Sequence, residues 1–297
     1  MFEKTRNDLK TLGLPSKDYF DMPTSNKKFV DGSDFRIEIP TVNSIEVMGA
    51  LIEESTKIGI VINRITETYG IFRHTKDEIK QMVGLCQAYG CEFVMSTGPR
   101  ASNDTSATAA SNQGKTIAYR LRGQEQIIRA IEDIKRGIDL GVSIFLIYDE
   151  GLLWILGKMR QNNMIAKNIK FKVSAHCGHG NPASLKLLEE LGANSINPVR
   201  DLQLPMLAAL RDVINIPIDV HTDNPAASGG FIRVYEAPEI VRIVSPVYLK
   251  TGNSVVSDHG SLTSSAKDGI KMARQASIVL EMVNNYYPQA KQSINEI

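Results

Sequence analysis

Short apolar runs alternate along the chain with longer stretches in which hydrophobic residues recur every three or four positions. The short runs predict buried strands, and the longer stretches predict amphipathic helices. The strands are expected at residues 35–40, 58–65, 91–97, 142–149, 171–176, 194–199, 216–222 and 246–251. The helices are expected at residues 75–88, 124–140, 183–191, 202–213, 238–244 and 264–286.

Strands that alternate with helices are typical of a parallel sheet, and eight such units predict a closed (β/α)8 barrel, or TIM barrel. Thr75 and Glu78 have the spacing of a capping box at one helix start, and Gly192 is placed to end another helix. We expect one barrel domain over residues 35–290, preceded by an N-terminal extension at residues 1–34. An open doubly wound sheet is the alternative, but no G-x-G-x-x-G motif follows the first strand.

The composition is that of an ordinary globular protein. Of the 297 residues, 42% are hydrophobic and 23% are charged, and the formal net charge is +1. This balance argues against binding to nucleic acid or to a membrane surface, because both favour a basic face. A small-molecule substrate is therefore the expected partner, together with a homo-oligomeric state. The charged start MFEKTRNDLK and the lack of an apolar run near ~18 residues predict a cytoplasmic protein.

Polar residues interrupt the apolar pattern where the strands face the inside of the predicted barrel. Alternate residues of each strand point inward, and the last of them lines the mouth, where barrel enzymes build their active sites. Burying a lone ionised group costs on the order of several kcal/mol, so polar and charged residues at inward-facing positions indicate a functional site. They are Glu38, Lys172, Ser174, His176, Asn197, Asp219, His221, Tyr248 and Lys250. The inward phase is ambiguous between Asn63 and Arg64, and among Tyr148, Asp149 and Glu150.

Three roles are open to these groups. Glu38, Asp149, His176, His221 and Lys250 are the catalytic candidates, with His221 first and Asp219 as its support. Glu38, His176, His221 and Asp223 could instead hold a divalent metal such as zinc, manganese or magnesium. Lys250 could form a Schiff base or could bind a substrate anion. Of these two roles, binding of a substrate anion is favoured for Lys250, because a lysine among carboxylates is more easily ion-paired than neutral.

Glycine-containing loops after the last two predicted strands suggest an anion site, because glycine lets backbone N–H groups approach an anion. Arginines at positions 64, 73, 100 and 200 could add positive charge. The long segment 98–123 has little periodicity and is expected to close over the site. The residues expected to contact substrate are Asn63, Arg64, Arg100, Tyr148, Ser174, Asn197, Gly229, Gly230, Thr251, Gly252 and Asn253.

The three cysteines, Cys86, Cys91 and Cys177, form no C-x-x-C pair and suggest neither a disulfide framework nor a zinc ribbon. Cys177 lies in HCGHGN (176–181), whose histidines lack the H-E-x-x-H spacing of metalloproteases. It could be a nucleophile beside His179. A structural thiol is favoured, because nothing in the sequence indicates a lowered pKa.

Two resemblances bear on function. The run VHTDN (220–224) resembles the H-x-H-N-D strand of metal-dependent barrels such as the isopropylmalate synthase and hydroxymethylglutaryl-CoA lyase group. It has a single histidine, His221, and the matching D-R-E pattern near the first strand is absent. The runs FRIEIPTVNS, KVSAHCGHGNPASLKLLEELGA and IDVHTDNPAASGGFIR resemble bacterial barrel proteins labelled as U32-type peptidases. The cysteine-bearing signature of collagenase-like members is missing, so no catalytic residue is carried over.

The sequence as a whole predicts a barrel enzyme for a small anionic metabolite carrying a carboxylate or phosphate. Lyase or isomerase chemistry at a carbon next to a carbonyl is the expected reaction, at the C-terminal mouth of the barrel. A metal-dependent hydrolase or peptidase is one alternative. A non-catalytic barrel for ligand binding or assembly is the other, with LLWIL (152–156) as a candidate assembly surface.

Overall fold

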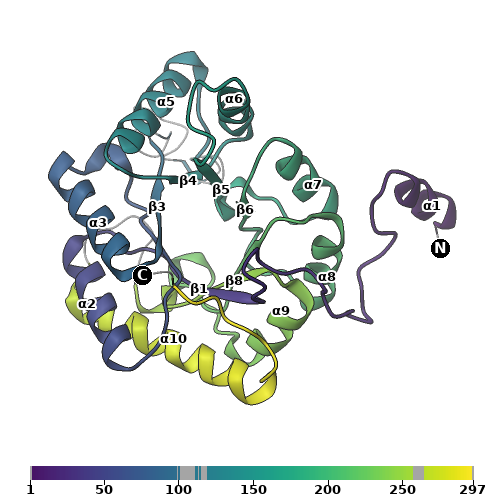
Figure 1. The fold of residues 1–297 in the computed structure, drawn as a ribbon. Coiled ribbons are helices and arrows are strands. Elements are labelled where there is room, and N and C mark those ends of the chain that lie inside the picture. The colour runs from purple at the N-terminus through teal and green to yellow at the C-terminus, as the bar shows by residue number, and fades with distance from the viewer. Residues whose placement is uncertain are drawn as a thin grey trace.

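Parallel strands close into a barrel in the computed structural model of the chain, which describes residues 2–98, 100, 111–112, 114, 119–256 and 264–295 (Figure 1). Each strand pairs with the next along the chain, and β8 pairs with β1 to close the ring. The predicted TIM barrel is thus confirmed, and the open sheet is excluded. The strands are β1 (Phe35–Ile39), β2 (Arg64–Thr66), β3 (Glu92–Ser96), β4 (Ile144–Ile147), β5 (Lys170–Val173), β6 (Ser195–Ile196), β7 (Ile218–His221) and β8 (Val247–Lys250).

A ring of helices surrounds the strands, as Figure 1 shows. The predicted capping box at Thr75 and Glu78 is present, and Gly192 ends its helix with a φ of +104°. Glycine adopts such a positive φ without a steric penalty. The helices of the ring are α2 (Ile45–Lys57), α3 (Lys76–Tyr89), α5 (Gly123–Asp139), α6 (Glu150–Gln161), α7 (Pro182–Glu190), α8 (Leu204–Val213), α9 (Ala237–Val244) and α10 (Ala266–Tyr286).

The second strand starts later than the sequence predicts. β2 is Arg64–Thr66 rather than residues 58–65, and α2, which was not among the expected helices, precedes it. Ser44 caps α2 by accepting a hydrogen bond from the Val47 N–H at 3.3 Å. Gly59, with a φ of +71°, then turns the chain. The apolar run that starts at residue 58 is therefore shared between a helix end, a turn and a strand, and periodicity does not separate these.

The two faces of the strands differ as the alternation predicts. Phe35, Ile37 and Ile39 of β1 belong to the main apolar core, which includes the inward faces of the helices. The inside of the barrel is itself divided. Its β3–β4 side carries a separate apolar cluster, whereas buried charged residues line the sides formed by β1, β2, β5, β7 and β8. The cluster comprises Val94, Ile144, Leu146 and Tyr148, with Tyr119 packed against it.

The N-terminal extension begins with α1 (Glu3–Thr11), which has no buried residue and stands apart from the barrel in Figure 1. The later part of the extension binds the outside of α8 and α9. The Tyr19 hydroxyl donates to Asp212 at 2.9 Å, and the Lys27 ammonium donates to the Ile214 carbonyl at 2.6 Å. This segment is thus fastened to the helical ring before β1 begins.

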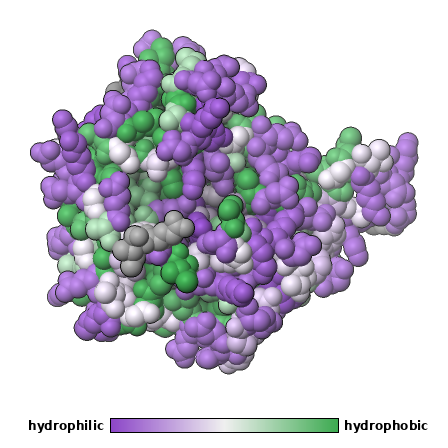
Figure 2. Space-filling model, viewed as in Figure 1, coloured by the Kyte–Doolittle hydropathy of each residue, from purple (hydrophilic) through white to green (hydrophobic). Residues whose placement is uncertain are grey.

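The outer surface gives little support to the predicted assembly face. In LLWIL, Leu152, Leu153 and Leu156 are buried against the barrel, and Trp154 is the strongly exposed member at 53%. Figure 2 shows polar side chains over most of the visible face, with apolar ones scattered among them. Over the described ranges, no helix combines the length and apolar character needed to cross a membrane.

Candidate active site

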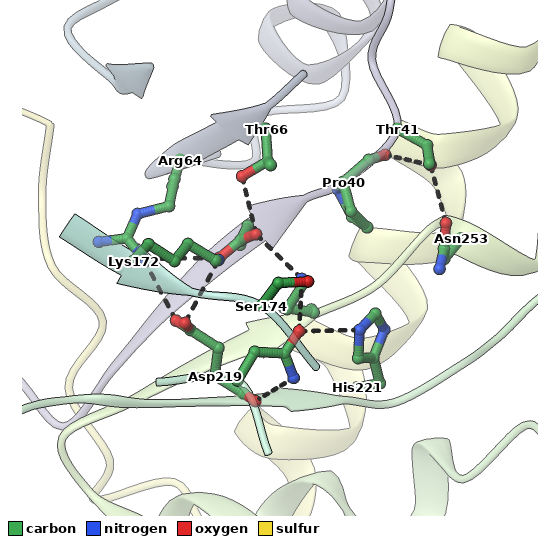
Figure 3. A network of polar contacts seen from close by, with 12 residues as sticks. Pro40, Thr41, Arg64, Thr66, Lys172, Ser174, Asp219, His221 and Asn253 are labelled. Atoms are coloured by element: carbon green, nitrogen blue, oxygen red, sulfur yellow. Dashed lines mark hydrogen bonds and ion pairs between the residues drawn. The ribbon is translucent and has the colours of Figure 1, made fainter. Parts of the chain in front are cut away.

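Glu38 of β1 is the centre of a charged network inside the barrel. Figure 3 shows other members of this network, among them Arg64, Lys172 and Asp219. Its carboxylate forms an ion pair with Lys172 and accepts a hydrogen bond from the Thr66 hydroxyl at 2.8 Å. The Lys250 Nζ lies 3.4 Å from Oε1, and an Arg64 nitrogen lies 3.6 Å from Oε2. Burial raises the pKa of Glu38, but the cations, Lys172 first, outweigh burial and lower the pKa to about 2. Glu38 is therefore ionised at neutral pH.

Asp219 of β7 is the second carboxylate of this network. One oxygen lies 3.2 Å from Arg64, and the other lies 3.3 Å from the Lys172 Nζ and accepts from Ser195 at 3.1 Å. Arg64 and Lys172 together match the charges of Glu38 and Asp219. Protonation of Lys250 would add a third positive charge to a region closed to water, where unmatched charge is costly.

Arg64 also pairs with Glu92 at the start of β3, at 2.8 Å. That carboxylate has further cations of its own, because Arg36 lies 3.5 Å and Lys170 lies 3.1 Å from it. The additional negative charge at the N-terminal end of the barrel is thus matched locally. The charge of Glu92 therefore does not change the balance of positive and negative charge around Lys250.

Lys250 lies at the end of β8, 5% exposed. Burial, followed by the positive charge of Lys172 and then of Arg200, lowers its pKa to about 7, although Glu38 and Asp219 act in the opposite direction. Its Nζ donates a hydrogen bond of 2.8 Å to the Asn197 Oδ1. At neutral pH a large fraction of Lys250 is therefore a neutral amine with an available lone pair.

Asn197, just after β6, orients both Lys250 and His221. Its amide nitrogen donates to the carbonyls of Asp219 at 2.9 Å and Pro198 at 3.2 Å. This arrangement directs the amide oxygen toward the Lys250 Nζ and toward the His221 Nε2, 3.2 Å away. Because an amide oxygen only accepts hydrogen bonds, Nε2 of His221 carries a proton. In the neutral imidazole the basic nitrogen is then Nδ1.

Aromatic rings and arginines form the outer part of the site. The rings of Tyr119 and His176 stack with centroids 4.0 Å apart. Arg200 donates to the His176 Nε2 at 3.1 Å, so this nitrogen is the unprotonated one. The Arg100 guanidinium lies over the Tyr148 ring at 4.5 Å and over Tyr119 at 5.1 Å.

These groups line a cavity of about 30 Å³ at the C-terminal mouth. Its wall contains three side chains that can carry a full positive charge, Arg100, Arg200 and Lys250, and the two imidazoles of His176 and His221. Tyr148, Ser174 and Asn197, all predicted to contact substrate, also line it. No aspartate or glutamate is among its lining residues in the described part of the chain. The cavity is therefore suited to an anion.

Several residues predicted to lie in the site have structural roles outside the cavity. Asp149 caps α6 by accepting from the Leu152 N–H at 3.0 Å. Asn63 lies away from the cavity, where it accepts from the Ile37 N–H at 2.9 Å and donates to the Ser293 carbonyl at 2.9 Å. Arg64 belongs to the charged network below the cavity. The spacing rules place these residues near strand ends but do not show which partners they find.

The predicted anion loops differ from expectation. Gly229 and Gly230 are exposed at a turn and do not line the cavity. In the loop 251–254, the Asp223 carboxylate accepts from the N–H groups of Asn253 at 3.3 Å and Ser254 at 2.9 Å. The backbone donors that a phosphate would require are thus bound by the protein's own carboxylate. Thr251, Gly252 and Asn253 are buried, and Asn253 is bound to other parts of the protein through the Thr41 hydroxyl at 2.7 Å and the Asp223 carboxylate.

The four predicted metal ligands do not gather. Glu38 binds Lys172 and Thr66, Asp223 binds the loop after β8, and His176 stacks on Tyr119. Among the residues that the structure describes, no group of three or more histidine, cysteine, aspartate or glutamate side chains is arranged to hold a metal ion.

The predicted closing segment 98–123 lies largely outside the described residues, which omit positions 99, 101–110, 113 and 115–118. Two of its described members, Arg100 and Tyr119, line the cavity. Tyr119 was not predicted, because the segment has no periodicity that marks an inward position. Lys172 was predicted to point inward without a role, and its effect on Lys250 depends on a contact between distant strands.

Cys177 is a buried structural thiol. Burial raises its pKa to about 12, and its Sγ lies 3.7 Å from the Ile147 carbonyl. His179 forms an ion pair with Glu150, and burial lowers its pKa. A thiol with a raised pKa contains little thiolate at neutral pH and is a poor nucleophile.

The cysteines should therefore differ in reactivity. We expect an aromatic disulfide reagent to titrate one thiol quickly in the folded protein, that of the partly exposed Cys91, and three after denaturation. Cys91→Ala should remove the fast phase. Fast labelling of Cys177 in the folded protein, located by peptide mass spectrometry, would contradict the structural assignment.

Comparisons with known proteins support the fold. No protein-family model matches the chain, and a search of curated protein sequences finds no match. The YdjI aldolase from Escherichia coli K12 resembles it with a TM-score of 0.51 and 10% identity, over 87% of this chain and 94% of that one. A designed cube-shaped protein cage, built by fusing symmetric oligomeric domains, gives a TM-score of 0.50 and 9% identity, over 86% and 73% of the two chains.

The U32 peptidase Mk0906 is also similar, with a TM-score of 0.44 and 14% identity over 69% of this chain and 74% of that one. At these identities the likenesses show the TIM-barrel fold alone. The likeness to the U32 peptidase gives no argument for peptide hydrolysis by this chain.

Proposed function

We propose that this barrel is an enzyme that forms an imine between Lys250 and the carbonyl group of a small anionic metabolite. Bond making or breaking at the adjacent carbon would follow, which is lyase or isomerase chemistry. One observation supports the proposal above all. Lys250 is a buried amine with a pKa of about 7, at the wall of a cavity lined by positive charge.

The charge balance favours a nucleophilic amine over the anion-binding role that the sequence favours for Lys250. The sequence argument treats Lys250 as the cation that the carboxylates would bind. In the fold, Lys172 and Arg64 already pair with Glu38 and Asp219. Desolvation and a neighbouring cation are the two ways in which proteins activate a lysine as a nucleophile, and Lys250 has both.

The neighbouring groups fit the steps of imine formation. The amine nitrogen would attack the carbonyl carbon, the carbonyl oxygen would leave as water after protonation, and a C=N⁺ group would result. Glu38, 3.4 Å from the Lys250 Nζ, would stabilise this positive charge. His221 lines the same cavity and would be the group that exchanges protons with the substrate, held in place by Asn197 at 3.2 Å from its Nε2. The iminium would then accept the electrons of a bond broken at the adjacent carbon.

Reductive trapping tests the proposal. We expect incubation with pyruvate or glyoxylate and cyanoborohydride at pH 7 to give one dominant adduct, located at Lys250 by peptide mass spectrometry. A lysine with an ordinary pKa is almost entirely protonated at this pH, so surface lysines should react slowly. Labelling that is spread over surface lysines and spares Lys250 would refute the proposal.

The other sequence predictions have separate tests. Elemental analysis of protein purified without added metal measures the divalent metal content that a metal-dependent hydrolase or peptidase requires. Light scattering coupled to size exclusion measures the predicted homo-oligomer. Tight metabolite binding without any adduct or turnover is the result expected for a non-catalytic barrel.

A further inference from the structure

Two arginines at the outer part of the cavity, Arg100 and Arg200, form no ion pair with any carboxylate that the structure describes. Arg100 is 5% exposed, and Arg200 is partly buried. The Nε atoms of both are buried without a hydrogen-bond partner, and the contacts that the described residues make with the two guanidinium groups are to aromatic rings and to an imidazole. A buried guanidinium without a counter-ion is unfavourable, so a ligand anion is the natural partner for this pair.

The neighbours of the pair restrict where the guanidinium groups can lie. Arg100 packs over the rings of Tyr148 and Tyr119, at 4.5 and 5.1 Å. Arg200 donates through one nitrogen to the His176 Nε2 at 3.1 Å. His176 in turn stacks on Tyr119. The two arginines thus belong to one assembly of stacked and hydrogen-bonded side chains. Contacts that hold charged groups in place favour binding, because less side-chain freedom is lost when a ligand binds.

We propose that Arg100 and Arg200 form a carboxylate subsite and that the ligand is a short 2-oxo acid, whose carbonyl carbon next to the carboxylate faces Lys250. This inference rests on the proposed imine chemistry and names its substrate class. The arginines and Lys250 line the same cavity of about 30 Å³, so the carboxylate and the reacting carbonyl must be close together. A 2-oxo acid joins these two groups directly.

A carboxylate fits this subsite better than a phosphate does. Planar guanidinium groups match the two oxygens of a carboxylate in a bidentate contact. The loop that could have supplied backbone donors to a phosphate is bound to Asp223. The small volume, about 30 Å³ among the described residues, also favours a short acid over a bulky one.

The condensation balances without a further reactant. The Lys250 nitrogen forms a bond to the carbonyl carbon, the C–O bond breaks, and one water molecule leaves with a proton from the amine and one from a general acid. No group is oxidised or reduced. In the trapping experiment, added cyanoborohydride supplies the hydride that converts C=N⁺ to a stable secondary amine.

The experiment compares pyruvate with acetone, which has the same carbonyl but no carboxylate. In the wild-type protein, pyruvate should give half-maximal labelling of Lys250 at a far lower concentration than acetone. Arg200→Met and Arg100→Met should each raise the pyruvate concentration required by about 10- to 100-fold, as expected for loss of a charge-assisted pair. Labelling by acetone should change much less, because it depends on Arg200 only through the small effect of that charge on the pKa of Lys250. Arg200→Lys keeps the charge but loses the planar guanidinium group. The pyruvate concentration that it requires should lie between those of the wild-type protein and Arg200→Met.

Arg73→Met is the matched control. Arg73 is an exposed arginine that the sequence also suggested for anion binding, but it packs on Tyr69 and does not line the cavity. Its replacement should leave the labelling by both probes unchanged. Thermal unfolding followed by circular dichroism identifies any variant that fails to fold. If Arg200→Met fails to fold, Arg100→Met and Arg200→Lys replace it in the test.

Binding of lactate separates the subsite from the chemistry, because lactate has a carboxylate but cannot form an imine. Calorimetric titration should show lactate binding that weakens in both arginine variants. Equal labelling by pyruvate and acetone, unchanged in the variants, would overturn the subsite while leaving imine formation at Lys250 intact. Lactate binding that depends on the arginines, without labelling of Lys250 by any carbonyl probe, would overturn the proposed function and retain the anion subsite.

Discussion

Replacing Lys250 with methionine is expected to abolish imine trapping while the barrel remains folded. Methionine has a similar length and flexibility but no amine. In the wild-type protein, the pKa lowered from 10.5 to about 7 leaves about half of the amine neutral at pH 7. An ordinary lysine would be neutral in only about 1 molecule in 3,000 at that pH, so the environment of Lys250 contributes about a thousandfold to the supply of free amine.

The pH profile provides a sharper measurement than loss of activity alone. Because the neutral amine is the reactive form, the trapping rate should level off above pH 7 and fall about tenfold per unit well below it. Between pH 7 and 10.5, unfolded chains bind more protons at this position than folded ones, so the stability contribution of Lys250 rises across that range. Lys250→Met should remove this rise, which urea unfolding at several pH values measures.

Lys158→Met is a suitable control, because Lys158 is exposed on α6 and far from the network. It should alter neither the rate nor the profile. A rate midpoint near pH 10 in the wild-type protein would contradict the assignment. Adduct formation at Lys172 rather than Lys250 would contradict it as well, since Lys172 is held by two carboxylates.

Glu38→Gln is expected to lower the free energy of unfolding by about 3–5 kcal/mol, the range found when one member of a buried ion pair is removed. The substitution keeps the shape of the side chain but removes the negative charge that faces Lys172, Lys250 and Arg64. These cations would remain buried with Asp219 as their remaining carboxylate in the centre of the barrel. Urea unfolding followed by circular dichroism at pH 7 measures the loss.

The pH dependence of this loss follows from the lowered pKa of Glu38, which lies at about 2 compared with 4.5 in an unfolded chain. The stabilising contribution is fully present above pH 4.5 and disappears as the pH falls through 2. The difference between the wild-type and variant proteins should therefore shrink in acid. Glu132→Gln, at an exposed pair with Lys135 on α5, should cost no more than about 0.5 kcal/mol. Equal losses in the two variants would show that Glu38 is not the centre of the network.

The sequence was a good guide to the inward-facing residues and a poor guide to their partners. Strand alternation correctly places Glu38, Lys172 and Asp219 inside the barrel, because a period of two is a local property. Which cation matches which carboxylate depends on contacts across the barrel between strands far apart in the chain, such as that of Glu38 in β1 with Lys172 in β5. The expected role of Lys250 changed for this reason.

The partners of loop residues are equally hard to predict from the sequence. Asp223 and Asp149 look like ligands in the sequence because they follow strands directly. In the fold, each accepts hydrogen bonds from nearby backbone N–H groups. A carboxylate that caps a helix or closes a turn has the same spacing as one that binds a substrate. Tyr119, by contrast, contributes to the cavity from a segment without any periodic signal.

The division of the barrel interior into an apolar β3–β4 side and a charged remainder has an evolutionary consequence. Leu146 belongs to the apolar cluster and also lines the cavity, opposite in character to Lys250 and His221. A change in its size would alter the room available to a substrate without disturbing any ion pair of the charged network. The preference for ligands of a given chain length and the reactivity of the Lys250 amine can thus change independently among descendants of this barrel.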